Sequence, residues 1–164
     1  MPAADNFAFT PDQAEQHRKH IVQCRKVLAK NAIRAHLHTL IVEDQAFSRR
    51  LLYQMLNQTC SVSTCANAKD GWKIYLEEVP DVVFLDIGLP GVSGHELADK
   101  IKELDPQSYV VMVTASQDVH DLQVAKVNQV DGFIIKPFNK KKIDDCIDRY
   151  RATHKTAVKA ESAP

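Results

Sequence analysis

The sequence predicts an α/β domain built on a doubly wound parallel sheet of five strands, preceded by an N-terminal helical extension. From residue 37 onward, short apolar segments alternate five times with segments of helical periodicity, as parallel strands joined by right-handed crossovers require. The third and fourth strand segments, "VVFL" (82–85) and "YVVMV" (109–113), are apolar throughout. Strands of that kind are covered by helices on both faces of the sheet.

The first half of the domain is expected to contain two strands and two helices. The segment "LHTLIV" (37–42) is strand-like, and "SVSTCA" (61–66) is a second, weaker strand. A helix over 69–78 contains Gly71, which lowers its helix propensity. A helix over 47–58 is indicated by apolar residues at helical spacing: Phe47, Leu51, Leu52, Met55 and Leu56.

The second half repeats the alternation three times. The predicted elements are strand 82–85, helix 95–104, strand 109–113, helix 118–128, strand 132–135 and helix 140–154. The last ten residues, "KTAVKAESAP" (155–164), are predicted to be a short disordered tail.

The extension over residues 1–36 is expected to contain one long helix. In "TPDQ" (10–13), Thr10 suits an N-cap, Pro11 the first helical position and Gln13 a capping box. Small and apolar residues then form a narrow stripe: Ala14, Ile21, Cys24, Leu28 and Ala32. This stripe could pack on the chain's own domain, pair with a second chain or dock on a target. Because little chain separates this helix from the first strand, we favour a homodimer through helix 12–35.

Composition excludes several classes of protein. The 164 residues carry no net charge, which argues against a nucleic-acid binder that relies on bulk electrostatics. No apolar run approaches the roughly 18 residues of a membrane span, and residues 1–20 lack a secretory signal, so we expect a cytoplasmic protein without a membrane partner. The four cysteines lack the spacing of a metal site and are expected to be buried, reduced thiols.

Polar side chains follow four of the predicted strands. Glu43 and Asp44 end the first, Asp86 the third, Thr114 the fourth and Lys136 the fifth. In doubly wound sheets, ligands bind at the carboxyl ends of the strands, so these side chains should share one pocket. Three close carboxylates repel one another unless a cation neutralises them. Mg²⁺ suits such oxygen ligands and commonly bridges to a phosphoryl group.

Four motifs together resemble the receiver domain of two-component response regulators, and the single-domain chemotaxis type is the closest likeness. They are "LIVED" (40–44), "VVFLDIGLPGVSG" (82–94), "VVMVTA" (110–115) and "GFIIKPF" (132–138), in the family's order. The resemblance covers residues 37 to about 153. It implies a flavodoxin-like sheet with strand order 2-1-3-4-5.

The resemblance also implies roles for the acidic residues. Asp86 matches the family's phosphoacceptor, which takes a phosphoryl group from a histidine kinase or a histidine phosphotransfer protein. Asp86 and Asp44 would bind Mg²⁺ directly, Glu43 would hold a metal-bound water, and the backbone carbonyl of Gly88 would be a further ligand.

The remaining matches concern the response to phosphorylation. Thr114 would hydrogen-bond the phosphoryl group and Lys136 would pair with it, while Phe133 matches the family's aromatic switch residue. Gly88 and Ser116 occupy positions that modulate the lifetime of the phosphorylated state. An unknown output protein would then bind the face formed by residues 118–154.

Three functions stay open at this point. The favoured one is a phosphorylation-dependent signalling switch that is not an enzyme in the usual sense, with a receiver domain over 37–154. The second is a Mg²⁺-dependent aspartyl-phosphate phosphohydrolase or phosphotransferase, although many such enzymes carry an Asp two residues after the nucleophile, where this chain has Gly88. The third is a docking scaffold that does not need phosphate.

Overall fold

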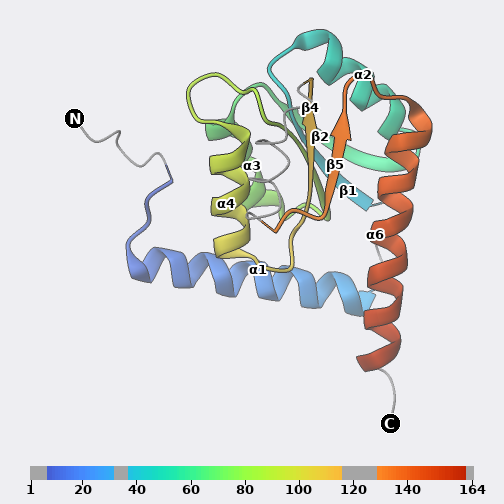
Figure 1. The fold of residues 1–164 in the computed structure, drawn as a ribbon. Helices are drawn as coiled ribbons and strands as arrows, with labels where there is room; N and C mark the ends of the chain where they lie inside the picture. The colour runs from blue at the N-terminus through green and yellow to red at the C-terminus, as the bar shows by residue number, and fades with distance from the viewer. Residues whose placement is uncertain (1–6, 32–36, 116–128, 162–164) are drawn as a thin grey trace.

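The computed structural model describes residues 7–31, 37–115 and 129–161, and they contain one five-stranded parallel sheet (Figure 1). The strand order β2-β1-β3-β4-β5 confirms the predicted flavodoxin-like topology. The strands are β1 (Leu37–Val42), β2 (Cys60–Cys65), β3 (Val82–Asp86), β4 (Tyr109–Thr114) and β5 (Gly132–Ile135).

Strands β3 and β4, which are apolar in sequence, lie in the interior of the sheet. Every residue of β3 and of β4 is buried, whereas the edge strand β2 is largely half-buried or exposed. Both central strands run one residue beyond the predicted end, so that Asp86 and Thr114 are their last residues. The polar residues that matter for the site are therefore fixed by the sheet itself.

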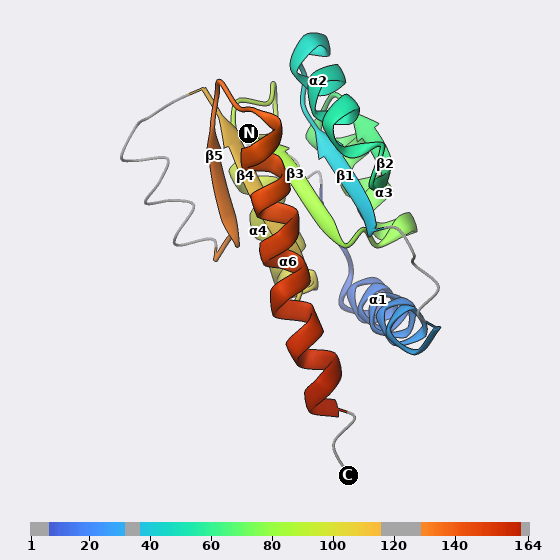
Figure 2. The same cartoon turned by 90° about the vertical axis from the view of Figure 1, so that its right-hand side faces the viewer.

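Helices cover both faces of the sheet, as Figure 2 shows. On one face, α2 (Ala46–Leu56) and α6 (Lys140–Glu161) pack Leu52, Leu56, Ile143 and Ile147 against the strands. On the other face lie α3 (Ala68–Glu78) and α4 (Gly94–Leu104), whose buried residues form a second core. A doubly wound sheet has helices on both faces, so one core on each face is expected.

The predicted disordered tail is wrong for most of its length. Helix α6 continues past residue 154 to Glu161 (Figure 2). The segment 155–161 contains neither Gly nor Pro, and its Lys, Ala and Glu residues are strong helix formers, so the preceding helix extends through it. The predicted helix 118–128 lies outside the described residues.

Phe47 does not join the core as its helical spacing predicted. Its side chain is 80% exposed, while Leu52 and Leu56 of the same helix are buried. Phe47 lies in the first turn of α2, just beyond the end of β1, where the neighbouring residues 44–46 are also exposed. Phe47 therefore lies in an exposed segment and stays on the surface.

The N-terminal extension forms α1 (Pro11–Asn31), which lies across the end of the domain where the strands begin (Figures 1 and 2). The predicted capping box is confirmed: Gln13 N donates to Thr10 Oγ1 at 3.3 Å, and Thr10 N to Gln13 Oε1 at 3.0 Å. Ile21 is only 2% exposed and belongs to the core of the α3–α4 face. The apolar stripe is thus used, at least in part, within the chain.

Two further expectations concern cysteines and membranes. All four cysteines are free, but only Cys60 and Cys146 are buried as expected, whereas Cys24 and Cys65 are half-buried. Burial still raises the pKa of the Cys65 thiol to about 11, which keeps it protonated at neutral pH. Among the helices that the structure describes, none combines the length and the apolar character needed to span a bilayer.

Candidate functional site

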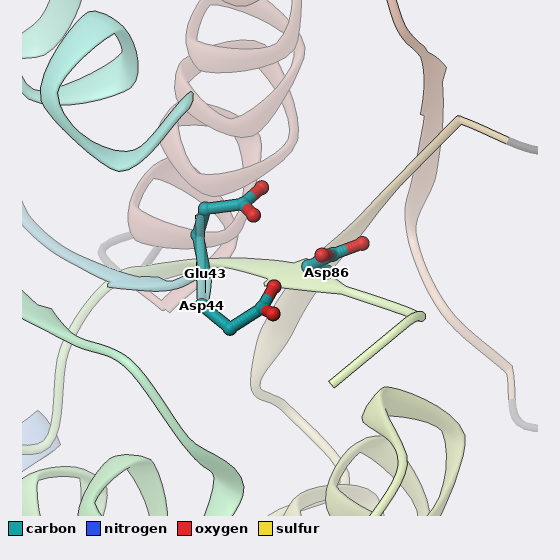
Figure 3. Close-up of side chains that lie close together, drawn as sticks. All are labelled: Glu43, Asp44 and Asp86. Atoms are coloured by element: carbon teal, nitrogen blue, oxygen red, sulfur yellow. The ribbon is translucent and has the colours of Figure 1, made fainter. Parts of the chain in front are cut away.

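Three carboxylates meet at the carboxyl end of the sheet. Glu43 and Asp44 directly follow β1, and Asp86 ends the neighbouring strand β3. One carboxylate oxygen from each lies within 4.8 Å of the others, and Figure 3 shows all three side chains turned toward the same space. Glu43 and Asp86 are buried, whereas Asp44 is exposed, so the cluster opens to solvent on the Asp44 side.

Lys136 supplies a positive charge from the end of β5. Its Nζ lies 2.7 Å from Glu43 Oε2 and 3.6 Å from Asp86 Oδ2. Its main-chain N–H donates to Thr114 O at 2.7 Å, which holds the turn after β5 against the end of β4. The Lys136 ammonium group therefore forms ion pairs with two of the three acids, Glu43 and Asp86.

Glu43 is the most deeply buried of the acids, with 1% of its surface exposed. Its pKa lies above the ordinary value, because burial and, to a smaller extent, the charge of Asp86 disfavour the carboxylate, while the ion pair with Lys136 acts in the opposite direction. One lysine does not offset three acids. The excess of negative charge is what a divalent cation would neutralise.

The loop after Asp86 explains why glycines follow this residue. The Gly88 N–H donates to Asp86 Oδ1 at 3.2 Å, and a Cβ at Gly88 would face mostly open space. By contrast, a Cβ at Gly94 would overlap the main-chain oxygen of Asp86, because α4 begins directly against that strand end. Gly94 allows close packing, and Gly88 leaves space beside the buried Asp86 carboxylate.

The sheet register places Thr114 beside the site and Phe133 on β5, two strands from Asp86. Thr114 is buried at the end of β4, one residue beyond Val113, which pairs with Asp86. Phe133 lies on β5 opposite Met112, is half-buried and packs against the core of the α3–α4 face. Ser116, which is predicted to modulate the lifetime of the phosphorylated state, lies outside the described residues.

The sequence reasoning missed one residue that contacts the acidic pair. Arg49, in α2, donates from Nη1 to the main-chain oxygens of Glu43 at 2.7 Å and of Asp44 at 3.1 Å. The segment "SRR" offers two neighbouring arginines, and nothing local indicates which of them turns back toward the end of β1.

This arrangement can perform two kinds of chemistry. The acidic cluster offers the hard oxygen ligands that Mg²⁺ prefers. Asp86 offers a carboxylate nucleophile, held by the Gly88 N–H and facing the charge of Lys136.

Comparison with known proteins identifies the family of this chain. The family model described as the response regulator receiver domain matches residues 39–148. The chemotaxis protein CheY of Halobacterium salinarum is 33% identical over 109 residues, which cover 66% of this chain and 91% of that protein. The sensory transduction protein LytT of Oceanobacillus iheyensis is 30% identical over 124 residues, which cover 73% of this chain and 50% of LytT.

Solved structures give the same result. The BeF3-activated receiver domain of DrrB is 26% identical and superimposes with a TM-score of 0.66, covering 71% of this chain and 98% of that domain. A CheY-like receiver domain from Methanospirillum hungatei is 25% identical with a TM-score of 0.70, covering 74% of this chain and 98% of that one. The chain spans about half the length of several of its relatives, including LytT and AfsQ1.

Proposed function

Because this chain belongs to the response regulator receiver domain family, we propose that it is a phosphorylation-dependent signalling switch with Asp86 as phosphoacceptor. The observation that carries the proposal is the position of Asp86, a buried carboxylate at the end of a buried strand, beside Lys136 and in a cluster of three acids that opens to solvent at Asp44. The phosphodonor would be a histidine kinase or a histidine phosphotransfer protein.

The reaction follows from the groups at the site. An Asp86 carboxylate oxygen attacks the phosphorus of a phosphohistidine, the P–N bond breaks, and the imidazole leaves with the bonding electron pair and takes up a proton. The product is an acyl phosphate on Asp86. Lys136, now 3.6 Å from Asp86 Oδ2, would pair with the phosphoryl oxygens, and the Thr114 hydroxyl would hydrogen-bond them.

The residues at the site fit Mg²⁺. Asp44, Asp86 and the backbone carbonyl of Gly88 would hold it, with Glu43 on a bound water, and the excess negative charge of the three acids supports this assignment. When bound, the cation offsets the charge that accumulates during phosphoryl transfer.

The signal would pass through protein contacts. Movement of Thr114 toward the phosphoryl group would shift the population of Phe133 orientations and so reshape the face formed by residues 118–154. We propose that an output protein binds this face. Gly88 and Ser116, which lie two residues after Asp86 and Thr114, would set the lifetime of the phosphorylated state.

The extension raises a separate question about assembly. A homodimer through helix 12–35 stays a prediction, and it would have to use the outer side of α1, where Val22 is 50% and Val27 43% exposed, because Ile21 is packed within the chain. Light scattering on the full chain decides between monomer and dimer. We place the protein in the cytoplasm, where its phosphodonors act.

Two competing functions make different predictions. A Mg²⁺-dependent phosphohydrolase would turn over a phosphate ester repeatedly, whereas a switch accepts one phosphoryl group per chain. A phosphate-independent scaffold would bind its partner equally well before and after phosphorylation.

The proposed function is tested with amide chemical shifts of the full chain, measured with and without Mg²⁺ and beryllofluoride. We expect Mg²⁺-dependent changes at the ends of β3 and β4 and around Phe133, and none of the beryllofluoride changes in Asp86→Asn. Identical spectra with and without beryllofluoride would refute the switch.

A further inference from the structure

Arg49 contacts the acidic pair at its main chain rather than at its carboxylates. Its Nη1 donates to Glu43 O at 2.7 Å and to Asp44 O at 3.1 Å. Both oxygens lie beyond the last residue of β1, Val42, where the pairing of β1 with its neighbouring strands has ended. A charged donor therefore holds the segment that carries two of the three acids.

Arg49 reaches this segment from a fixed position. It lies in the first turns of α2, and its main-chain N–H donates to Gln45 O at 3.0 Å, so the helix backbone sets where the side chain begins. The side chain of Gln45, the residue before the helix, makes no capping hydrogen bond. Arg49 does not replace this cap, since it donates to carbonyl oxygens, but it links the helix to the end of β1.

With Arg49, each polar group of Glu43 has a partner, although Oε2 has an ion pair and no hydrogen bond among the described residues. Its N–H donates to Cys65 O at 3.1 Å, its Oε1 accepts from Gln45 N at 3.1 Å, its Oε2 lies 2.7 Å from Lys136 Nζ, and its main-chain oxygen accepts from Arg49. Asp44 has an exposed carboxylate, so the hydrogen bond to its main-chain oxygen is what ties it to α2.

We propose that Arg49 is a positioning residue for the cation site: it fixes the main chain of Glu43 and Asp44 so that both carboxylates stay turned toward the space shared with Asp86. This inference rests on the proposed function, since it assigns Arg49 to the site that would hold Mg²⁺. Outer groups that orient ligands in this way affect metal affinity because they reduce the ordering that binding requires.

The positive charge of the Arg49 guanidinium should weaken Mg²⁺ binding, whereas positioning of the acids should strengthen it. These two opposite effects on Mg²⁺ affinity make the proposal testable. As a positive charge near the site, Arg49 repels a cation. If its charge were all that mattered, removing it would tighten Mg²⁺ binding. If it positions the acids, removing it weakens binding, so the sign of the change separates the two roles.

The experiment is a calorimetric Mg²⁺ titration of the full chain without phosphodonor, on wild type, Arg49→Met, Arg49→Lys and Arg50→Met. We expect Arg49→Met to raise the Mg²⁺ dissociation constant about tenfold. Arg49→Lys, which keeps a charged donor, should fall between this variant and wild type. Arg50 is the exposed neighbour on the same helix, so Arg50→Met loses the same charge and should leave the constant unchanged.

A second readout separates positioning from general damage to the fold. With a small acyl-phosphate donor, Arg49→Met should need more Mg²⁺ for half-maximal phosphorylation but reach the wild-type rate at saturating Mg²⁺. A lowered rate at saturation, or a dissociation constant in Arg49→Met equal to or below that of wild type, overturns the proposal. If Arg49→Met does not fold, the same criteria apply to Arg49→Lys. If wild type itself neither binds Mg²⁺ nor accepts phosphate, the proposed function fails, and this inference fails with it.

Discussion

Arg25 Nε donates to Asp105 Oδ2 at 3.0 Å, which joins the N-terminal helix to the end of α4 across 80 residues of sequence. Tyr75 completes the cluster, since its hydroxyl donates to the same Asp105 oxygen at 2.7 Å and accepts from Arg25 Nη2 at 3.2 Å. Asp105 and Tyr75 are buried, and burial is the main cause of the raised pKa of Tyr75. The extension is therefore attached to the receiver by a partly buried charge pair as well as by Ile21.

Replacing Arg25 should destabilise the protein, because Asp105 would stay buried without its charged partner and would keep only the hydrogen bonds from the Tyr75 hydroxyl and the Gln107 N–H. We expect Arg25→Met to lower the free energy of unfolding by about 3 kcal/mol. Urea unfolding can be followed by the fluorescence of Trp72, the single tryptophan, whose ring lies 5.6 Å from those of Phe7 and Phe9. Lys19→Met on the exposed side of α1 is the control and should change stability by less than about 0.5 kcal/mol. Equal stability of the two variants would mean that α1 is not docked through Arg25.

The two glycines near Asp86 should respond differently to alanine. Gly94→Ala should cost about 3 kcal/mol of stability, because its Cβ would overlap the main-chain oxygen of Asp86 and neither strand nor helix can move freely. Gly88→Ala, with open space around its Cβ, should change stability by less than about 0.5 kcal/mol. Thermal unfolding of both variants measures the contrast, and a tolerated Gly94→Ala would show that α4 does not start against β3.

Phe47 and Leu52 share a helix but should differ in their contribution to stability. Phe47→Ala should change the free energy of unfolding by less than about 0.5 kcal/mol, since its side chain is 80% exposed. Leu52→Ala should cost about 3 kcal/mol, because it leaves a cavity in the core. Urea unfolding of the two variants compares them directly, and a large loss in Phe47→Ala would mean that Phe47 is packed.

Glu43 should make stability depend on pH in the absence of divalent cations. Its pKa is raised in the folded protein, so between the unfolded and the folded pKa the native state binds more protons, and stability falls as pH rises through this window. In Glu43→Gln this contribution disappears. Urea unfolding of both proteins from pH 4 to 8 tests this: the wild type should lose stability relative to the variant as pH rises.

The same unfolding measurements with Mg²⁺ added serve as the control for the metal-free series. At 100 times its dissociation constant, Mg²⁺ should stabilise wild type at neutral pH by about 2.7 kcal/mol. The gain should shrink at low pH, where protons compete for the acids. A wild type whose stability relative to Glu43→Gln rises with pH in metal-free buffer would contradict the assignment.

The fold was largely predictable because its signals are local. Apolar strands at 82–85 and 109–113 can be satisfied only at the centre of a sheet covered on both faces, and this alone fixes much of the topology. The acids were predictable for a related reason: Asp86 directly follows a buried strand, and parallel strands bring their carboxyl ends together.

The features that the sequence did not reveal depend on tertiary contacts. Phe47 has the spacing of a core residue, but whether a neighbouring element covers the first turn of a helix is not encoded in its periodicity. The partner of Arg25 lies 80 residues away, and Arg49 acts on main-chain oxygens, which leave no trace in the sequence. The polar composition of residues 155–161 predicts disorder, but their intrinsic helix propensity continues α6 to Glu161.

The most direct test of the account is the site of phosphorylation. The full chain is incubated with a small acyl-phosphate donor and Mg²⁺, and the modified residue is identified by mass spectrometry of its peptides after reductive trapping of the acyl phosphate. We expect one phosphoryl group per chain, on Asp86, dependent on Mg²⁺ and absent from Asp86→Asn, and we expect Asp44→Asn to require more Mg²⁺. Label on another residue, or label retained at the wild-type level in Asp86→Asn, would contradict this expectation.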